Sequence, residues 1–170
     1  MTTPKAKLAG LALIAALCAG FTLGLTASAW AGRDEADAAY QRGDYATAIR
    51  EMRPLAEQGK AEAQYNLAIM YRNGEGVPQD YARAVEWYRK AAEQGFARAQ
   101  SNLGFMYRKG RGVPQDYLRA YAWYDLAASR YPSGEDRDRA ARNRDMITIW
   151  MTPAQISEAQ KLAREWKPKK

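Results

Sequence analysis

The sequence of 170 residues contains no histidine and a single cysteine, Cys18. Without histidine there is no imidazole to serve as a general base, as a metal ligand or as a charge switch near neutral pH. Cys18 lies in an N-terminal segment that we expect to be removed, which leaves the mature chain without a thiol. Disulfide bonds, zinc ribbons, iron–sulfur clusters and cysteine nucleophiles are therefore excluded from the mature protein.

Sequence motifs for catalysis are also missing. No Ser-x-x-Lys segment occurs, and a Ser-His-Asp triad cannot be built without histidine. The Gly-x-Gly segments 74–76 and 110–112 lack the lysine and the strand context of a phosphate-binding loop, and we interpret them as turns. The candidates for a glycosidase carboxylate pair are Glu62, Glu86, Glu93 and Asp44, but we favour helix surfaces or helix caps for them. The sequence therefore predicts no enzymatic activity, no cofactor and no metal.

Residues 1–31 are predicted to be a secretory signal peptide. Lys5 and Lys7 form a short basic start, and residues 8–25 are uncharged. Small residues then allow cleavage after Ala31 or Ala29. The alternative is an uncleaved membrane anchor, because the apolar run reaches the lower limit of a spanning length. We favour cleavage, which places the mature protein in the periplasm or outside the cell.

The net charge of the whole chain is +7, and it falls to +5 when the two lysines of the signal peptide are removed. The remaining length matches one domain, which buries about two-thirds of its unfolded surface. In a cytosolic protein such a basic excess would suit nucleic acid. In an exported protein we expect no nucleic acid, and acidic peptides or acidic envelope polymers instead. Membrane contact is expected only through the signal segment if it stays attached.

The chain repeats itself with a period of 36 residues. When residues 63–95 are placed over residues 99–131, 20 of the 33 aligned positions are identical without a gap. Both copies contain Ala-Gln-x-Asn-Leu, Met-Tyr-Arg, Gly-x-Gly-Val-Pro-Gln-Asp-Tyr and Trp-Tyr-x-x-Ala-Ala in the same order. A weaker third copy lies upstream, where Asp44 precedes Asp80 by one period. Such self-similarity is typical of a solenoid of stacked units.

Each unit is predicted to form two helices. Ala63, Leu67 and Tyr71 recur at helical spacing and mark the buried face of the first helix. Gly74 can end that helix because glycine adopts positive φ, and Asp80 can cap the second helix. We interpret the repeated tryptophans as core residues rather than sugar-stacking residues. The buried stripe of the second helix is predicted to contain Tyr81, Ala84, Trp87, Tyr88, Ala91 and Ala92, with Tyr117, Ala120, Trp123, Tyr124 and Ala127 in the next unit.

The repeat pattern ends near residue 132. Ser133 is predicted to cap a helix that starts near Glu135, and the mixed charges of residues 135–145 are expected to form a solvated helix face. We predict that residues 133–166 form a helical cap, because the last unit of a solenoid would otherwise expose its apolar side.

The end of the chain carries a second helix signal. Thr152 and Gln155 have the capping-box spacing, and the helix that follows is expected to end near Trp166. Trp150 and Trp166 are assigned to the interior of the cap. The basic tail, residues 167–170, is expected to be disordered.

The repeats resemble Sel1-like repeats, which are relatives of the tetratricopeptide repeat. The pattern is Ala-x-x-x-Leu-Gly/Ala-x-x-Tyr-x-x-Gly-x-Gly-Val-x-x-Asp, followed by Ala-x-x-Trp-Tyr-x-x-Ala-Ala. Within residues 32–132 it assigns a degenerate repeat to 32–60 and full repeats to 61–96 and 97–132. The resemblance implies an all-α fold, namely a right-handed α-solenoid of antiparallel helical hairpins with a C-terminal helical cap.

The resemblance also implies a function. Proteins of this family are typically adaptors and scaffolds, and many bacterial members are exported. It implies a non-enzymatic adaptor of the bacterial cell envelope that binds a protein or peptide on its concave face. The penicillin binding of a cysteine-rich branch is not implied, since the mature chain has no cysteine. The alternative is a factor associated with peptidoglycan or exopolysaccharide that binds the wall or modulates a wall enzyme.

The concave face of a helical solenoid is built from one helix of each pair. Asn66 and Asn102 repeat there in register, at positions where related repeats use asparagine to hydrogen-bond an extended peptide. Cations beside aromatic side chains suit an acidic peptide or a C-terminal carboxylate. The alternative is an ordinary polar face, with both asparagines bonding between neighbouring helices. The predicted partner-binding residues are Tyr65, Asn66, Ile69, Arg72, Arg98, Asn102, Phe105, Arg108 and Lys109.

Overall fold

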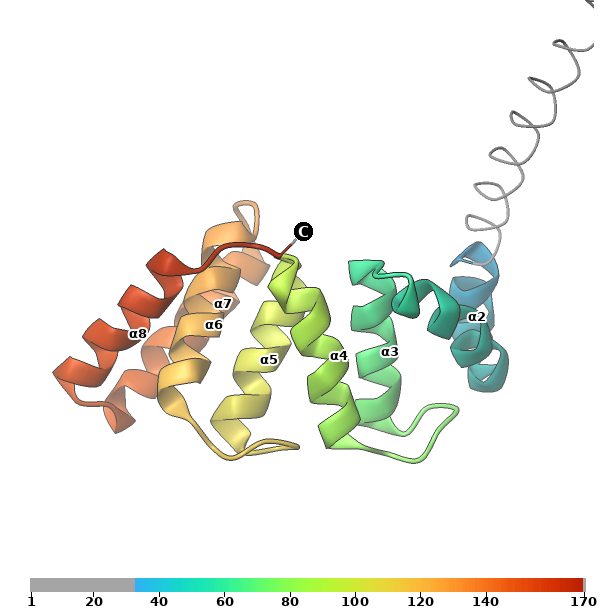
Figure 1. The fold of residues 1–170 in the computed structure, drawn as a ribbon, viewed down its shortest axis with the longest axis horizontal. Coiled ribbons are helices and arrows are strands. Elements are labelled where there is room, and N and C mark those ends of the chain that lie inside the picture. The colour runs from blue at the N-terminus through green and yellow to red at the C-terminus, as the bar shows by residue number, and fades with distance from the viewer. Residues whose placement is uncertain (1–32, 170) are drawn as a thin grey trace, which may run out of the picture.

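The computed structural model describes residues 33–169, so the predicted signal peptide lies outside the described residues. All regular structure in this range is helical (Figure 1). Residues 33–41 form the first helix of this range, and the 3-10 helix η1 (Thr148–Trp150) joins the last two α-helices. The remaining helices are α2 (Tyr45–Glu57), α3 (Ala61–Asn73), α4 (Tyr81–Glu93), α5 (Ala97–Lys109), α6 (Tyr117–Arg130), α7 (Glu135–Ile147) and α8 (Pro153–Glu165).

The helices follow one another along the molecule from α2 to α6, and α7 and α8 lie at the far end beside α6 (Figure 1). From α2 to α6 each helix packs against the next, and α7 and α8 both pack against α6. The structure is therefore an α-solenoid, which confirms the predicted fold class. None of the helices between residues 33 and 169 has the length and apolar character needed to cross a membrane.

Local chemistry sets the helix ends of both full repeats. Gly74 and Gly110 follow α3 and α5 in the left-handed conformation, with φ of 78° and 64°. The Asp80 carboxylate accepts a hydrogen bond from the backbone N–H of Arg83 at 2.9 Å and thereby caps α4. Asp116 caps α6 in the same way. The predicted glycine stops and aspartate caps are confirmed.

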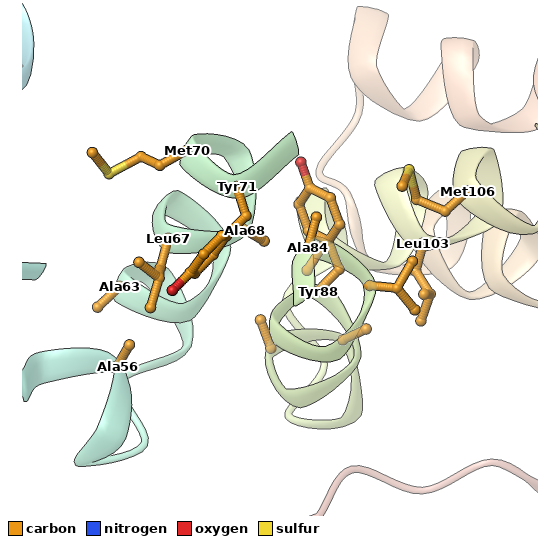
Figure 2. Packing of buried hydrophobic residues seen from close by; sticks show 14 of the residues in the cluster. Ala56, Ala63, Leu67, Ala68, Met70, Tyr71, Ala84, Tyr88, Leu103 and Met106 are labelled. Atoms are coloured by element: carbon orange, nitrogen blue, oxygen red, sulfur yellow. The ribbon is translucent and has the colours of Figure 1, made fainter. Parts of the chain in front are cut away.

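The core runs continuously between the stacked hairpins. Figure 2 shows Ala84 and Tyr88 of α4 between Leu67 of α3 on one side and Leu103 of α5 on the other. Burial of these side chains joins neighbouring hairpins and provides most of the stabilising apolar contact. The predicted stripe of the second helices is too wide, because Tyr81, Trp87, Tyr117 and Trp123 are only partly buried.

Two buried glutamines link consecutive hairpins. Gln64 donates a hydrogen bond from Nε2 to the carbonyl oxygen of Ala56, and Gln100 donates to that of Ala92, both at 3.1 Å. Each glutamine lies at the start of a first helix and gives a second donor to a carbonyl at the end of the preceding second helix, which also accepts from the N–H of Gly59 or Gly95. Because these bonds join one hairpin to the next, the Ala-Gln pair of the repeat has a structural role.

The start of α7 differs from the sequence prediction. The residue at the N-cap position is Gly134, and no side chain caps the helix, so the prediction of Ser133 as the cap was wrong. The first turn instead carries three acidic side chains, which the positive end of the helix dipole stabilises. These are Glu135, Asp136 and Asp138.

The start of α8 agrees with the prediction. Thr152 and Gln155 form a complete capping box, and the helix ends at Trp166 as its C-cap. The tail was expected to be disordered, yet Lys169 binds the end of α4. Its backbone N–H donates to the Glu93 carbonyl at 2.7 Å, and its Nζ lies 2.8 Å from the Glu93 carboxylate. Figure 1 shows this tail running from α8 back across α6 to α4.

Candidate functional site

A polar groove of about 530 Å³ lies between α3, α5 and α7. Five of the nine predicted binding residues line it, and they come from two consecutive repeats: Tyr65, Arg72, Arg98, Asn102 and Phe105. Its other lining residues are Ser101, Tyr124, Tyr131, Asp136, Arg139 and Asn143. The structure therefore brings together most of the predicted residues at one hollow, and adds residues from the predicted cap.

Asn102 lies at the centre of a hydrogen-bond network that joins α3 to α5. Its Oδ1 accepts from Nη1 of Arg72 at 3.4 Å, and its Nδ2 donates to the hydroxyl of Tyr65 at 3.4 Å. The Tyr65 ring is fixed in turn against Phe96, with ring centroids 5.2 Å apart. Asn102 thus bonds between neighbouring helices, as the alternative interpretation held, while it also lines the groove.

The groove carries more positive than negative charge. Arg139 forms an ion pair with Asp136, which is the one acidic residue among the lining residues. Arg72 and Arg98 form no ion pair with any acidic residue of the described range 33–169. Two cations therefore face the groove without a carboxylate partner from the described chain, and an anionic group of a ligand can neutralise them.

Two tyrosine hydroxyls complete the polar lining. Burial, and to a smaller extent the neighbouring Asp136 carboxylate, raises the pKa of Tyr131 to about 12. Burial also raises the pKa of Tyr124, which the nearby Arg108 guanidinium partly offsets. The Tyr124 hydroxyl is buried and has no hydrogen-bond partner within residues 33–169. Both hydroxyls stay protonated near neutral pH, and that of Tyr131 is a donor for a ligand oxygen, whereas that of Tyr124 lies below the surface of the groove.

The other four predicted residues lie elsewhere. Asn66 and Ile69 line a separate hollow of about 200 Å³ between the helix 33–41 and α3. The Arg108 guanidinium covers the Phe105 ring at 5.5 Å from its centroid, and Lys109 is exposed outside the groove. Positions that are equivalent in the repeat are displaced by one unit along the solenoid, so Asn66 and Asn102 face different hollows.

The α7 wall of the groove was not found by sequence reasoning. Its mixed charges predicted a solvated helix face, and α7 carries none of the repeat motifs. In the structure Asp136, Arg139 and Asn143 line the groove. Their spacing of three and four residues marks one side of a helix, and this pattern was the available signal.

Another hollow, of about 410 Å³, lies between α4, α6 and α8. Trp123 and Trp166 line it, with ring centroids 6.3 Å apart and steeply inclined planes. Glu93 and Glu165 contribute carboxylates to the same hollow. Trp123 was assigned to the core of the repeats and Trp166 to the interior of the cap, and the structure leaves both partly exposed.

No cluster of three acidic, histidine or cysteine side chains that could bind a metal ion occurs between residues 33 and 169.

The family model of the Sel1 repeat matches residues 61–96 and 97–131. A protective antigen present in uropathogenic Escherichia coli strains, which displays an SLR fold, is similar with a TM-score of 0.73 and 31% identity. That match covers 81% of this chain and 29% of the antigen. The resemblance to Sel1-like repeats is confirmed.

A second solved structure supports the same conclusion. A Sel1 repeat protein from Oxalobacter formigenes is similar with a TM-score of 0.62 and 28% identity, over 79% of this chain and 56% of that protein. The chain thus spans less than two-thirds of the length of either solved relative. Among curated proteins, none matches the sequence.

Proposed function

Because this chain carries two Sel1 repeats, which generally mediate protein–protein interactions, we propose that it is a non-enzymatic adaptor of the bacterial cell envelope. Its partner is a protein or peptide with acidic side chains or a free C-terminal carboxylate. The binding site is the groove between α3, α5 and α7.

One observation carries the proposal, namely that Arg72 and Arg98 line a polar groove without an acidic partner from the described chain. A guanidinium binds carboxylates through two parallel N–H donors, so each arginine can hold one acidic group of a peptide. The lining is mostly polar, which favours an extended acidic segment over an apolar helix.

The neighbouring side chains have the chemistry to hold the rest of such a segment. Ser101 and Asn143 present donors and acceptors for peptide N–H and C=O groups. Phe105 offers an apolar contact at the groove, and Tyr65 has a fixed ring because it packs on Phe96 and Tyr88. Preordered side chains lose little entropy on binding, so the groove needs little rearrangement to receive a partner.

The envelope location rests on the signal-peptide pattern of residues 1–31. Export is tested by determining the N-terminus of the protein isolated from the cell. A mature chain that begins at Trp30 or Gly32 supports the proposal, and a chain that retains the first residues in the cytoplasm contradicts it.

Partner binding is tested by photocrosslinking in an envelope extract. A photoreactive residue replaces Phe105 in the groove, and in a matched protein it replaces Glu86, an exposed position on α4. The proposal expects a distinct protein adduct from position 105 that is absent from position 86 and lost in R72E/R98E. Equal adducts from both positions, or an adduct that survives the double charge reversal, would place the partner elsewhere.

The hollow lined by Trp123 and Trp166 supports a second candidate, which is binding to a cell-wall polymer. Aromatic rings and carboxylates together suit a sugar chain, through stacking and hydrogen bonds to hydroxyl groups. This candidate expects retention on insoluble peptidoglycan after a wash in moderate salt, and reduced retention for Trp123→Ala. If the parent protein washes off the wall, this second function is wrong.

A further inference from the structure

The turn between α7 and α8 concentrates exposed apolar side chains. Of the five exposed large hydrophobic residues in the described range, three lie within positions 146–150. Met146 is 47% exposed, Ile149 is 73% exposed and Trp150 is 51% exposed. We call these three residues the apolar tip. Single exposed apolar residues are ordinary, but a cluster of this kind marks an interaction site.

The apolar tip is held in a defined position. Trp150 stacks on Tyr117 at the start of α6, with ring centroids 5.3 Å apart and planes inclined by 16°. The 3-10 turn is closed by a hydrogen bond from the N–H of Met151 to the carbonyl of Thr148 at 3.0 Å. Ile149 therefore projects from a rigid turn rather than from a loose loop.

Basic side chains adjoin the apolar tip. The sulfur of Met146 accepts a hydrogen bond from Nη1 of Arg108 at 3.7 Å. Arg108 and Arg111 both lie over the Phe105 ring, at 5.5 and 5.8 Å from its centroid, and Lys109 between them is exposed. None of these three cations forms an ion pair with an acidic residue within the described part of the chain.

The nearby acidic groups are already paired. Asp145, next to the tip, forms an ion pair with Arg144 at 2.8 Å. Asp116, which precedes Tyr117, forms an ion pair with Arg119 at 3.5 Å. The tip is consequently an apolar surface with a net positive border.

We propose that the apolar tip docks on an anionic membrane surface. Tryptophan is favoured at the boundary between headgroups and acyl chains, and aliphatic side chains enter below it. The cations beside the tip are attracted by anionic lipids. Figure 1 places the α7–α8 turn at the outer end of the solenoid, on the same edge as the α5–α6 loop that carries Arg111. A projecting apex of this shape can enter a bilayer surface without a matching pocket.

This membrane contact is separate from the predicted signal segment and from the groove, and it does not depend on the proposed adaptor function. It also extends the expectation from the sequence, in which only the signal segment meets a membrane. An adaptor held at the membrane through the tip would keep the groove free for its partner, because neither Ile149 nor Trp150 lines it.

The test uses the full chain with a position-specific probe. In a Cys18→Ser background, Ile149→Cys carries an environment-sensitive apolar fluorophore, which keeps position 149 apolar. The matched protein carries the same label at Ser133→Cys, an exposed position in the α6–α7 connection on the opposite edge (Figure 1). Both proteins are added to vesicles of phosphatidylglycerol and to vesicles of phosphatidylcholine. Because the readout is local, binding of the N-terminal segment does not imitate insertion of the tip.

The proposal expects a blue shift at position 149 with phosphatidylglycerol vesicles, a much smaller one with phosphatidylcholine, and none at position 133. Adding K109E/R111E should weaken the vesicle titration at least about tenfold, with an unchanged circular dichroism spectrum. No shift at position 149, or equal shifts at both positions, overturns the proposal. A shift produced by lipid-free envelope proteins and not by vesicles also overturns it and makes the tip a protein-binding surface.

Discussion

Gly112 lies directly against the carbonyl oxygen of Tyr81, so that a Cβ atom at this glycine would come within 2.2 Å of that oxygen. Gly76 has the same relation to Tyr45 one repeat earlier, at 2.5 Å. The loop inside each hairpin therefore rests on the first residue of the second helix of the preceding hairpin. This close approach explains why the Gly-x-Gly-Val-Pro segment recurs, where the sequence alone predicted only a turn.

Replacing Gly112 by alanine should lower the free energy of unfolding by about 2–5 kcal/mol, because it adds backbone strain at positive φ to an overpacked contact. Gly59→Ala is the matched control, since Gly59 also has positive φ but has no atom near the position of a Cβ. The control should lose only about 1–2 kcal/mol. Urea denaturation measures both, and equal losses would show that the inter-hairpin contact contributes nothing.

Replacing Gln100 by alanine should destabilise the protein by about 0.5–1.5 kcal/mol, because the carbonyl of Ala92 loses one of two donors and keeps only the backbone N–H of Gly95. Gln58→Ala serves as the comparison, since the Gln58 side chain is exposed and should change the stability by less than about 0.5 kcal/mol. Thermal melts followed by circular dichroism measure the difference. A Gln100 variant as stable as the Gln58 variant would contradict the linking role of the buried glutamines.

The C-terminal end of the chain should be held mainly by Trp166, the C-cap of α8, rather than by Lys169 of the tail. Trp166 receives the Arg130 guanidinium at 4.3 Å from its ring centroid and packs edge-on to Trp123. Trp166→Ala should therefore cost about 1–3 kcal/mol. Lys169→Ala should cost less than about 1 kcal/mol, because its ion pair with Glu93 is exposed on the lysine side. A lower melting temperature for Lys169→Ala than for Trp166→Ala would contradict the larger contribution of Trp166.

The free energy of unfolding should fall as the pH rises above the pKa of tyrosine in the unfolded chain. The pKa of Tyr131 and the pKa of Tyr40 are both raised from 10.0 to about 12, chiefly by burial, with a hydrogen bond to Glu75 contributing at Tyr40. Between these values the unfolded chain releases protons that the folded chain retains, so the stability present below pH 10 is lost progressively toward pH 12. Unfolding in urea at about pH 9 and about pH 11 measures this slope. Tyr131→Phe should reduce the slope, and an unchanged slope would show that Tyr131 contributes no such linkage.

Features set by neighbouring residues could be predicted from the sequence. Asp80 caps a helix through a backbone N–H three residues away, and Gly74 ends a helix through its own φ, so neither requires knowledge of the tertiary fold. The repeat period then predicted how the hairpins stack. Ser133 shows the limit of this reasoning. A serine before a helix caps it only when the backbone places the serine at the N-cap position, and here Gly134 occupies the N-cap position.

The candidate site was only partly accessible to sequence reasoning. Tyr65 and Asn102 were predicted as binding residues from their place on the concave side. Their mutual hydrogen bond could not be predicted, because it joins two repeats and the sequence of a single repeat contains no pattern that indicates it. Arg139 lines the groove because of the way α7 packs against α6, and α7 lies outside the repeats. Trp150 was expected to be buried because it is apolar, but at the end of the solenoid no further unit covers it among the described residues.

A protein partner is expected to bind through Arg72 and Arg98, the groove cations that form no ion pair with an acidic residue between positions 33 and 169. The most direct measurement is the dissociation constant for the partner captured from position 105, with the parent chain, with R72E/R98E and with the matched control R50E/R164E, which reverses two exposed arginines outside the groove. The groove variant should bind at least about tenfold more weakly. The affinity of the control should change by less than about twofold. Equal weakening by both variants, or none by either, would contradict binding through these two arginines.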